Sequence, residues 1–336
     1  MANLKTKYMG IELDNPIILG ASNMANDLDK LKKAEEFGVG AIVFKSLFEE
    51  QIQLEALQLD EKLTEFNDIY AEMLTIHPDV KFAGPDDHLV NLRKAKESLS
   101  VPLIASLNAI NYDTWIKYAK LLSETGVDGI ELNFYHIPSD FNKDAKEIED
   151  EQIKIVNAIS KNSSIPISVK LSTNYSNILN FINRLDQTGI DAFVLFNSFF
   201  QPDIDIANEK HSKSFNYSNE GDYKQSLRYS GLLFENIKAD VCGSHGVFTG
   251  ADVIKLILSG SSCVQGVSTF YKNGLKQITS IKKELADWME IKNYKSIDEF
   301  RGNLSKNKLN KNSLVYKRAQ YVDLLMNSEN IFGDIH

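Results

Sequence analysis

The feature of this chain that most constrains its fold is a weak internal repeat of short apolar segments. Eight such segments lie between about residues 15 and 266. Four follow a glycine at the end of a helical stretch, as at Gly126 and Gly189, and glycine commonly ends helices because it adopts positive φ freely. Three others open with X-Pro, as at Pro102 and Pro166, and proline is tolerated at the first residue of a strand. The predicted strands are 15–19, 40–44, 101–105, 129–132, 165–169, 192–195, 239–242 and 262–265.

The segments between these strands show helical periodicity. Trp115, Tyr118, Ala119 and Leu122, for example, are spaced i, i+3, i+4 and i+7, which is typical of a core-facing stripe. Short apolar strands that alternate with amphipathic helices indicate a parallel α/β protein. Eight strands that are apolar throughout favour closure into a (β/α)₈ TIM barrel over an open doubly wound sheet.

The repeat also predicts the domain organisation. We expect one barrel domain over residues 1–290, with residues 291–336 forming a C-terminal helical extension packed on it. Two stretches outside the repeat, 46–100 and 199–236, follow the second and sixth strands. They are therefore predicted to be loop insertions at the C-terminal face, where barrel enzymes keep their active sites.

Composition narrows the classes of partner. The 336 residues carry 37 basic and 46 acidic side chains, a net charge of −9, without a long basic run. This balance argues against nucleic acid or an anionic membrane surface and favours a small-molecule substrate. No apolar run approaches the ~20 residues of a membrane span, and the two cysteines, Cys242 and Cys263, fit a reducing compartment, so we expect a cytoplasmic protein. An iron–sulfur cluster would need four cysteines, so a cluster would have to lie in another chain.

Polar residues gather just past the predicted strands, where a barrel brings them to one mouth. The set holds two lysines and three asparagines but no carboxylate, which is unsuited to Mg²⁺ and favours an anionic ligand. Asparagine amides also suit a planar heterocycle or a carboxamide. The predicted mouth residues include Ala21, Ser22, Lys45, Ser46, Ser106, Asn108, Asn133, His136, Lys170, Asn197 and Ser198.

Two glycine-containing turns complete this mouth. Gly243, Ser244, His245 and Gly246 follow the seventh strand, and Gly266, Val267 and Ser268 follow the eighth. Thr249 and Asp252 have the spacing of a capping box, which predicts a helix start directly after the first turn. Barrels bind phosphate with these two turns, although the glycines alone would also fit ordinary tight turns.

Two mouth residues carry alternative chemistry. His136 is either a general acid or base, since imidazole titrates near neutrality, or a surface loop histidine. Lys170 is either a fixed cation or the amine of a flavin-free lyase or aldolase that forms a Schiff base with a carbonyl substrate.

Over about residues 5–304 the chain resembles the FMN-dependent dihydroorotate dehydrogenases, in particular their class 1 branch. The opening segment, the strand-two lysine and serine, the strand-four and strand-six asparagines, the strand-five lysine and the closing segment all have counterparts. The motifs are Asn15-Pro16, Gly20-Ala21-Ser22, Phe44-Lys45-Ser46, Glu131-Leu132-Asn133, Val169-Lys170-Leu171, Phe196-Asn197-Ser198, Tyr229-Ser230-Gly231, 243–250, 264–268 and 294–300 with Gly302.

The resemblance implies FMN at the barrel mouth and oxidation of a CH–CH bond by hydride transfer to flavin N5. Lys170 would face the flavin N1 and O2 edge, and Asn133 and Asn197 would bind the substrate. The implied flavin site comprises Ala21, Ser22, Lys45, Ser46, Asn108, Asn133, Lys170, Asn197, Ser230, Gly231, Gly243, Ser244, His245, Gly246, Gly266, Val267 and Ser268. No metal ligand is implied, whereas a homodimer and a separate electron-transfer partner both fit the class 1 resemblance.

The chain departs from the family where the substrate would bind. His136 occupies the position of the family's cysteine or serine base, and Pro138 replaces an expected asparagine. Residues 64–92 contain no clear counterpart of the second asparagine motif. The resemblance therefore implies dihydroorotate or a related small molecule as the substrate, and a catalytically silent flavin-binding subunit is a further alternative.

Overall fold

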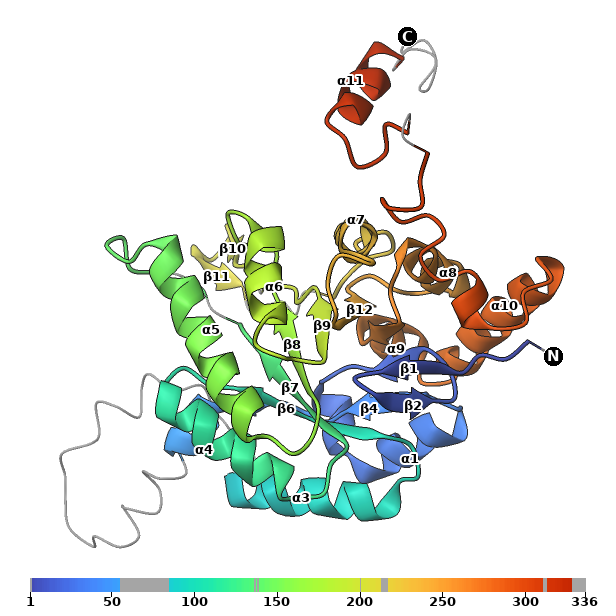
Figure 1. Cartoon of the computed structure of the whole chain (residues 1–336). Coiled ribbons are helices and arrows are strands. Elements are labelled where there is room, and N and C mark those ends of the chain that lie inside the picture. Colours follow the sequence, from blue (N-terminus) through green and yellow to red (C-terminus); the bar gives the residue numbers. More distant parts are fainter. Residues whose placement is uncertain are drawn as a thin grey trace, which may run out of the picture.

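A computed structural model describes residues 2–54, 85–135, 137, 139–199, 201–212, 217–310 and 313–327 of the chain. Eight parallel strands pair in the order β4-β3-β13-β12-β9-β8-β7-β6. The last of them, β6, also pairs with β4, which closes the sheet into a barrel. Helices lie between successive strands on the outside (Figure 1). The predicted (β/α)₈ barrel is confirmed.

All eight barrel strands coincide with predicted segments, within a few residues at their ends. Gly38, Gly126, Gly189 and Gly260 have positive φ before four of them, as the helix-ending role required. The barrel strands are β3 (Ile17–Leu19), β4 (Ala41–Val43), β6 (Leu103–Asn108), β7 (Gly129–Asn133), β8 (Ile167–Leu171), β9 (Ala192–Leu195), β12 (Asp240–Ser244) and β13 (Cys263–Gly266).

Helices cover the barrel by burying one apolar stripe each. On α4, Trp115, Tyr118, Ala119 and Leu122 are buried, as their spacing predicted. The helices are η1 (Asn23–Asn26), α1 (Leu28–Glu36), α3 (Pro85–Ser98), α4 (Tyr112–Ser123), α5 (Ala145–Asn162), α6 (Ile178–Asp186), α7 (Lys224–Leu233), α8 (Gly250–Ser259), α9 (Ser268–Asn273), α10 (Gln277–Ile291), η3 (Ile297–Glu299) and α11 (Ala319–Met326). Within the described ranges, no helix is both long enough and apolar enough to cross a membrane.

A hairpin of β1 (Thr6–Tyr8) and β2 (Ile11–Leu13) closes the amino-terminal end of the barrel. Tyr8 and Met9 are buried in one cluster with Ile18, Cys242 and other side chains of the barrel interior. The Met9 N–H donates to Asp240 Oδ2 over 3.0 Å, which fixes the hairpin to β12. Access to the barrel interior is therefore left to the carboxyl ends of the strands.

Two further strand elements lie in the predicted insertions. The short strand β5 (Leu47–Phe48) pairs with the end of β6. A hairpin of β10 (Asp203–Asp205) and β11 (Lys210–Ser212) follows β9. Both insertions continue from carboxyl ends of barrel strands, as expected.

The segment after α10 packs on the barrel over its first part. Phe300 and Ser305 are fully buried, and the Gly302 and Leu304 N–H groups donate to the carbonyls of Ile257 and Leu258. By contrast, α11 buries none of its residues and projects away from the barrel (Figure 1). The extension thus combines a packed segment with an exposed helix.

Glu49 is a buried carboxylate that joins the helical segment directly after β5 to the start of α4. It is 2% exposed and accepts from the N–H groups of Ile110 and Asn111 at 2.5 and 2.8 Å and from Thr114 Oγ1 at 3.1 Å. Burial alone would raise the pKa of Glu49, but these hydrogen bonds outweigh burial and hold the pKa below its usual value.

Replacing Glu49 with Gln is expected to lower the free energy of unfolding by about 1–3 kcal/mol, because charge-assisted hydrogen bonds are weakened in a buried site. The pKa of Glu49 is lower in the folded protein than in the unfolded chain. The stabilisation by its carboxylate is therefore fully present above the unfolded-state pKa and is lost as the pH falls through the folded-state pKa. Denaturant unfolding at neutral and acidic pH would measure both effects. Glu12→Gln, at an exposed position, is the control and should change stability little; equal effects of the two substitutions would contradict this role.

Candidate active site

A pocket of about 200 Å³ lies at the carboxyl ends of β8, β9, β12 and β13. Nine residues of the predicted flavin site line it, from loops that are far apart in the sequence. They are Ala21, Lys170, Asn197, Ser244, His245, Gly246, Gly266, Val267 and Ser268. The same pocket is also lined by Phe196, Ser198, Ser218, Val247 and Gln265.

Lys170 belongs to a buried polar triad at the base of this pocket. Its Nζ donates to Gln265 Oε1 over 3.1 Å and lies 3.6 Å from Glu131 Oε1. Gln265 Nε2 in turn donates to Glu131 Oε2 over 2.6 Å. Glu131 is 1% exposed, so the barrel mouth does contain a carboxylate, contrary to the sequence-based expectation. The sequence reasoning counted only residues past each strand, whereas Glu131 points inward from within β7.

The asparagines at the ends of β7 and β9 form a second feature of the mouth. Asn197 Nδ2 donates to Asn133 Oδ1 over 2.7 Å. Just beyond them, the rings of Tyr135 and Phe199 meet edge to face with centroids 4.9 Å apart. The two loops therefore place amide groups and aromatic rings close together, an arrangement that can hold a small planar ring by its polar edge and its face.

The turns after β12 and β13 form the other end of the pocket. Thr249 caps α8 and forms the predicted capping box with Asp252. His245 and Gly246 both have positive φ, of 72° and 73°, which gives a tight turn directly before that helix. The Ser218 N–H donates to Ser268 Oγ over 3.0 Å and ties the preceding loop to the second turn. Turns and helix starts of this kind present backbone N–H groups that suit an anion.

His245 lies between groups of opposite charge in this turn. Its Nε2 is 3.7 Å from Asp222 Oδ2. Burial lowers the pKa of His245, with Asp222 acting in the opposite direction and Lys170 adding to the lowering. Near neutral pH the imidazole is therefore mainly uncharged and can act as a hydrogen-bonding group of the turn.

Lys45, Ser46 and Asn108 lie at the carboxyl ends of β4 and β6, outside the pocket lined by Lys170. Ser46 Oγ and Ser106 Oγ are 2.7 Å apart and share a hydrogen bond. Burial lowers the pKa of Lys45. His88 on α3, which the sequence reasoning did not single out, is buried near Lys45, and burial together with that charge lowers its pKa to about 4.

Three predicted flavin-site residues lie elsewhere in the structure. Ser230 and Gly231 are buried inside α7, where Ser230 Oγ hydrogen-bonds Ser261 Oγ and Gly231 faces the Tyr316 hydroxyl. Gly243 packs against Leu256 of α8. The structure brings none of the three to the pocket, and Ser218 lines it instead. The Ser-Gly pair was matched to the family's glycine turn by residue type, but here the glycine makes room for the C-terminal segment.

His136 and Pro138 lie outside the described residues, and so do residues 64–84 of the stretch that lacks a clear counterpart of the second asparagine motif. The role of His136 as acid or base stays a prediction.

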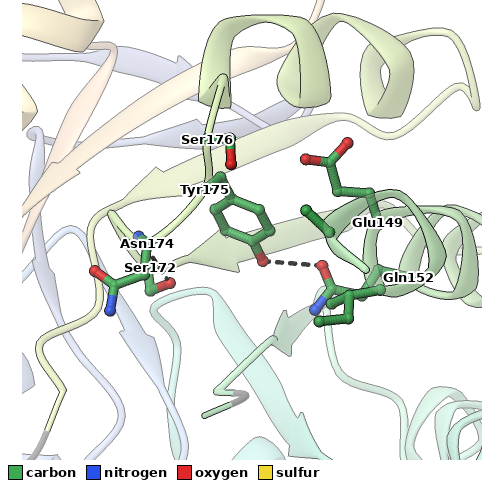
Figure 2. Close-up of a pocket in the computed structure, with 8 residues that line it drawn as sticks. Glu149, Gln152, Ser172, Asn174, Tyr175 and Ser176 are labelled. Atoms are coloured by element: carbon green, nitrogen blue, oxygen red, sulfur yellow. Dashed lines mark hydrogen bonds between the residues drawn. The ribbon is translucent and has the colours of Figure 1, made fainter. Parts of the chain in front are cut away.

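A second, smaller pocket lies on the same face, between α5 and the loop after β8 (Figure 2). Tyr175 donates its hydroxyl to Gln152 Oε1 over 2.9 Å across this pocket. Glu149 at its rim is paired with Arg184 at 3.0 Å. Tyr175, Gln152 and Glu149 are thus held by neighbouring side chains, and the pocket contains none of the predicted site residues.

Residues 84–289, more than half of the chain, match the family model of dihydroorotate dehydrogenase. The chain belongs to the dihydroorotate dehydrogenase family. The predicted family is confirmed, and with it an oxidoreductase that acts on CH–CH bonds.

Proteins similar to this chain over most of its length come from several microorganisms. The chain is 26% identical to the catalytic subunit of dihydroorotate dehydrogenase B (NAD(+)) from Thermoplasma acidophilum over 311 residues, covering 90% of this chain and 99% of that protein. It is 25% identical over 300 residues to the same subunit from Methanocaldococcus jannaschii, covering 86% and 94%. It is also 23% identical over 345 residues to the NAD-dependent dihydropyrimidine dehydrogenase subunit PreA of Escherichia coli K12, covering 94% and 81%. The family membership thus extends over nearly the whole chain, at low identity.

Proposed function

We propose that this dihydroorotate dehydrogenase family member binds FMN at the barrel mouth and uses it to oxidise a CH–CH bond of a small cyclic substrate. The observation that carries the proposal is Lys170, a buried lysine held at the base of a pocket that ends in two phosphate-type turns. A fixed cation beside a ring that accepts a hydride stabilises the negative charge that develops there.

The residues present fit FMN. Ser22 Oγ and Asn108 Nδ2 are buried without a hydrogen-bond partner in the structure, and both belong to the predicted flavin site. Buried polar atoms normally have partners, so these two are available to the heteroatoms of a bound ring or ribityl chain. The turns at Gly246 and Ser268 would hold the phosphate, and Lys170 would serve the ring.

When bound, FMN supplies the acceptor for a hydride at its N5 atom. The chain's own residues would do the rest. Asn133 and Asn197 orient the substrate through their amides, and Lys170 keeps a positive charge at the edge of the pocket. His136 removes a proton from one carbon of the substrate as the neighbouring carbon gives up its hydride.

The substrate we propose is dihydroorotate or a related dihydropyrimidine. Similar proteins are named for each of these two substrates. The two hydrogen-bonded asparagines provide both donors and acceptors for a cyclic amide. The aromatic contact between Tyr135 and Phe199 adds a surface for its ring face.

The contact between Lys170 and Glu131 argues against the alternative of a Schiff-base lyase. A Schiff-base lysine must lose its proton to attack a carbonyl. A carboxylate 3.6 Å from Nζ favours the protonated ammonium instead. The geometry therefore supports a fixed cation in preference to a nucleophile.

Electrons must leave the flavin after each turnover, and we propose that a separate protein receives them. The similar proteins are named as subunits, which is consistent with such a partner. The chain has only two cysteines, both buried and free, and an iron–sulfur cluster with four cysteine ligands would have to lie in that partner.

Comparing FMN with riboflavin tests the site, because riboflavin lacks the phosphate. Measured by equilibrium titration of the apoprotein, FMN is expected to bind at least about tenfold more tightly, or about 1.4 kcal/mol. Gly246→Ala should remove much of this difference, since Gly246 has φ of +73° and a Cβ there would lie 2.7 Å from the Asn219 carbonyl oxygen.

Gly10→Ala is the matched control for that substitution. Gly10 has a similar φ of +76°, but a Cβ there meets no atom within 4 Å, and it lies in the hairpin at the opposite end of the barrel. It should leave the preference for FMN unchanged. Equal affinities of the unmodified protein for FMN and riboflavin would contradict the assignment of the two turns to phosphate.

A further inference from the structure

Glu131 is the least exposed charged group at the mouth, and neither the family resemblance nor the proposed mechanism gives it a role. Its neighbours on adjacent strands are Ser106 of β6 and Ser168 of β8. Its Oε2 accepts from Gln265, while its Oε1 has no hydrogen-bond partner and lies 3.6 Å from Lys170 Nζ. A buried carboxylate is costly unless it is paired, so the ion pair with Lys170 is what makes this position tolerable.

We infer that Glu131 is a positioning residue that keeps Lys170 protonated and directs its ammonium group toward the pocket. The inference rests on the proposed function only in that the Lys170 charge is taken to act on bound FMN. The contacts among Lys170, Gln265 and Glu131 need no bound flavin.

Lys170, Gln265 and Glu131 make different contacts within the triad. Gln265 accepts from Lys170 and donates to Glu131, so its amide bridges the two charged groups and fixes their separation. An ammonium group has three N–H donors. One is directed to Gln265 and another side faces Glu131, which leaves a donor for a ligand in the pocket that Lys170 lines.

Two titratable groups of the described residues, from two other elements, lie close enough to Lys170 to act on its charge. Glu131 on β7 favours its protonated form, whereas His245 in the turn after β12 would disfavour it if charged. Because burial lowers the pKa of His245, that imidazole is mainly neutral near pH 7 and Glu131 dominates.

Reductive methylation of the apoprotein with formaldehyde and cyanoborohydride, followed by peptide mass spectrometry, tests this directly. Only the neutral amine reacts, so the rate at each lysine reports its deprotonated fraction as pH is varied. In Glu131→Gln, the pH at half-maximal labelling of Lys170 should fall, with labelling about tenfold or more faster at a given pH below that midpoint. Glu131→Asp, which keeps the charge, should lie between the two.

Lys96 supplies the internal reference in the same samples. It pairs with Asp128 at 2.6 Å, away from the pocket, and its labelling should be the same in all variants. An unchanged Lys170 profile in Glu131→Gln, with Lys96 also unchanged, would overturn the inference. Since no flavin is present, that result would leave the proposed FMN chemistry standing.

The unmodified protein provides a second test if Glu131→Gln fails to fold. Lys45 and Lys170 are both 8% exposed, but burial lowers the pKa of Lys45 while Lys170 has Glu131 beside it. Lys170 should therefore reach half-maximal labelling at a higher pH than Lys45. A midpoint for Lys170 at or below that of Lys45 would also overturn the inference.

Discussion

Replacing Lys170 with Met is expected to slow reduction of the bound flavin by substrate about 10²- to 10³-fold, the effect typical of removing one preorganised group that stabilises developing charge. Met retains much of the side-chain volume but leaves Glu131 without its ion-pair partner, so the rates are compared on protein that is folded and loaded with FMN. Rapid mixing under anaerobic conditions would give the rate of the reductive step separately from electron transfer to an acceptor.

Two further variants show whether loss of the positive charge at residue 170 causes the slower reduction. Lys170→Arg keeps a cation in the pocket and should retain more activity than Lys170→Met, although a planar guanidinium will not reproduce the contact with Gln265. Lys96→Met removes a partly exposed lysine that is paired with Asp128 and should leave the reductive rate unchanged. If FMN-loaded Lys170→Met is reduced at the normal rate, Lys170 has no electrostatic role in the reaction.

His136→Ala is expected to have the second large effect, lowering the reductive rate about 10²- to 10⁴-fold while leaving FMN binding intact. A base must be unprotonated, so the rate of the unmodified protein should fall as pH drops through the range in which imidazole titrates. The variant should lose this pH dependence together with its rate. Anaerobic rapid mixing of the two proteins with substrate at a series of pH values would measure both changes.

His211→Ala is the control for that experiment, because His211 is exposed on the hairpin of β10 and β11. It should behave like the unmodified protein. A normal rate in His136→Ala would show that another group removes the proton, and His136 would then be an ordinary loop histidine.

The barrel itself was predictable because its strands are marked at their starts by local chemistry. Gly126 and Gly189 adopt positive φ after their helices, and proline precedes strands such as β6 and β8. These constraints act within a few residues, so they can be read from sequence without knowing the tertiary structure. The capping box of Thr249 and Asp252 was predictable for the same reason.

The site was predictable only where residues follow a strand end. Lys170, Asn197 and the two glycine turns meet at one pocket because the barrel brings all the carboxyl ends together. Glu131 and Gln265 were not predicted as site residues because they lie within strands β7 and β13. The sequence does not reveal which side chains of a strand point into the barrel near its mouth. Gly231 does not line this pocket, because it lies inside α7, where a Cβ would meet the hydroxyl of Tyr316, 85 residues later in the chain.

For the C-terminal extension, the sequence did not show which surfaces its helices would bury. Phe300 and Gly302 resemble the closing segment of the family. Phe300 is buried against Trp288 of α10, and the Gly302 N–H donates to the Ile257 carbonyl of α8. The apolar residues of α11, among them Leu325 and Met326, are exposed instead. Apolar periodicity predicts that a helix has a face to bury, but it does not identify the surface that covers it.

The most direct test of the proposed function is anaerobic addition of substrate to the FMN-loaded protein, followed by the visible absorbance of the flavin. We predict that the oxidised flavin band bleaches with dihydroorotate or with dihydrouracil, a ring of the same class. This result would also exclude a catalytically silent flavin-binding subunit. A protein that takes up no FMN, or one whose bound flavin stays oxidised with both donors, would contradict the account.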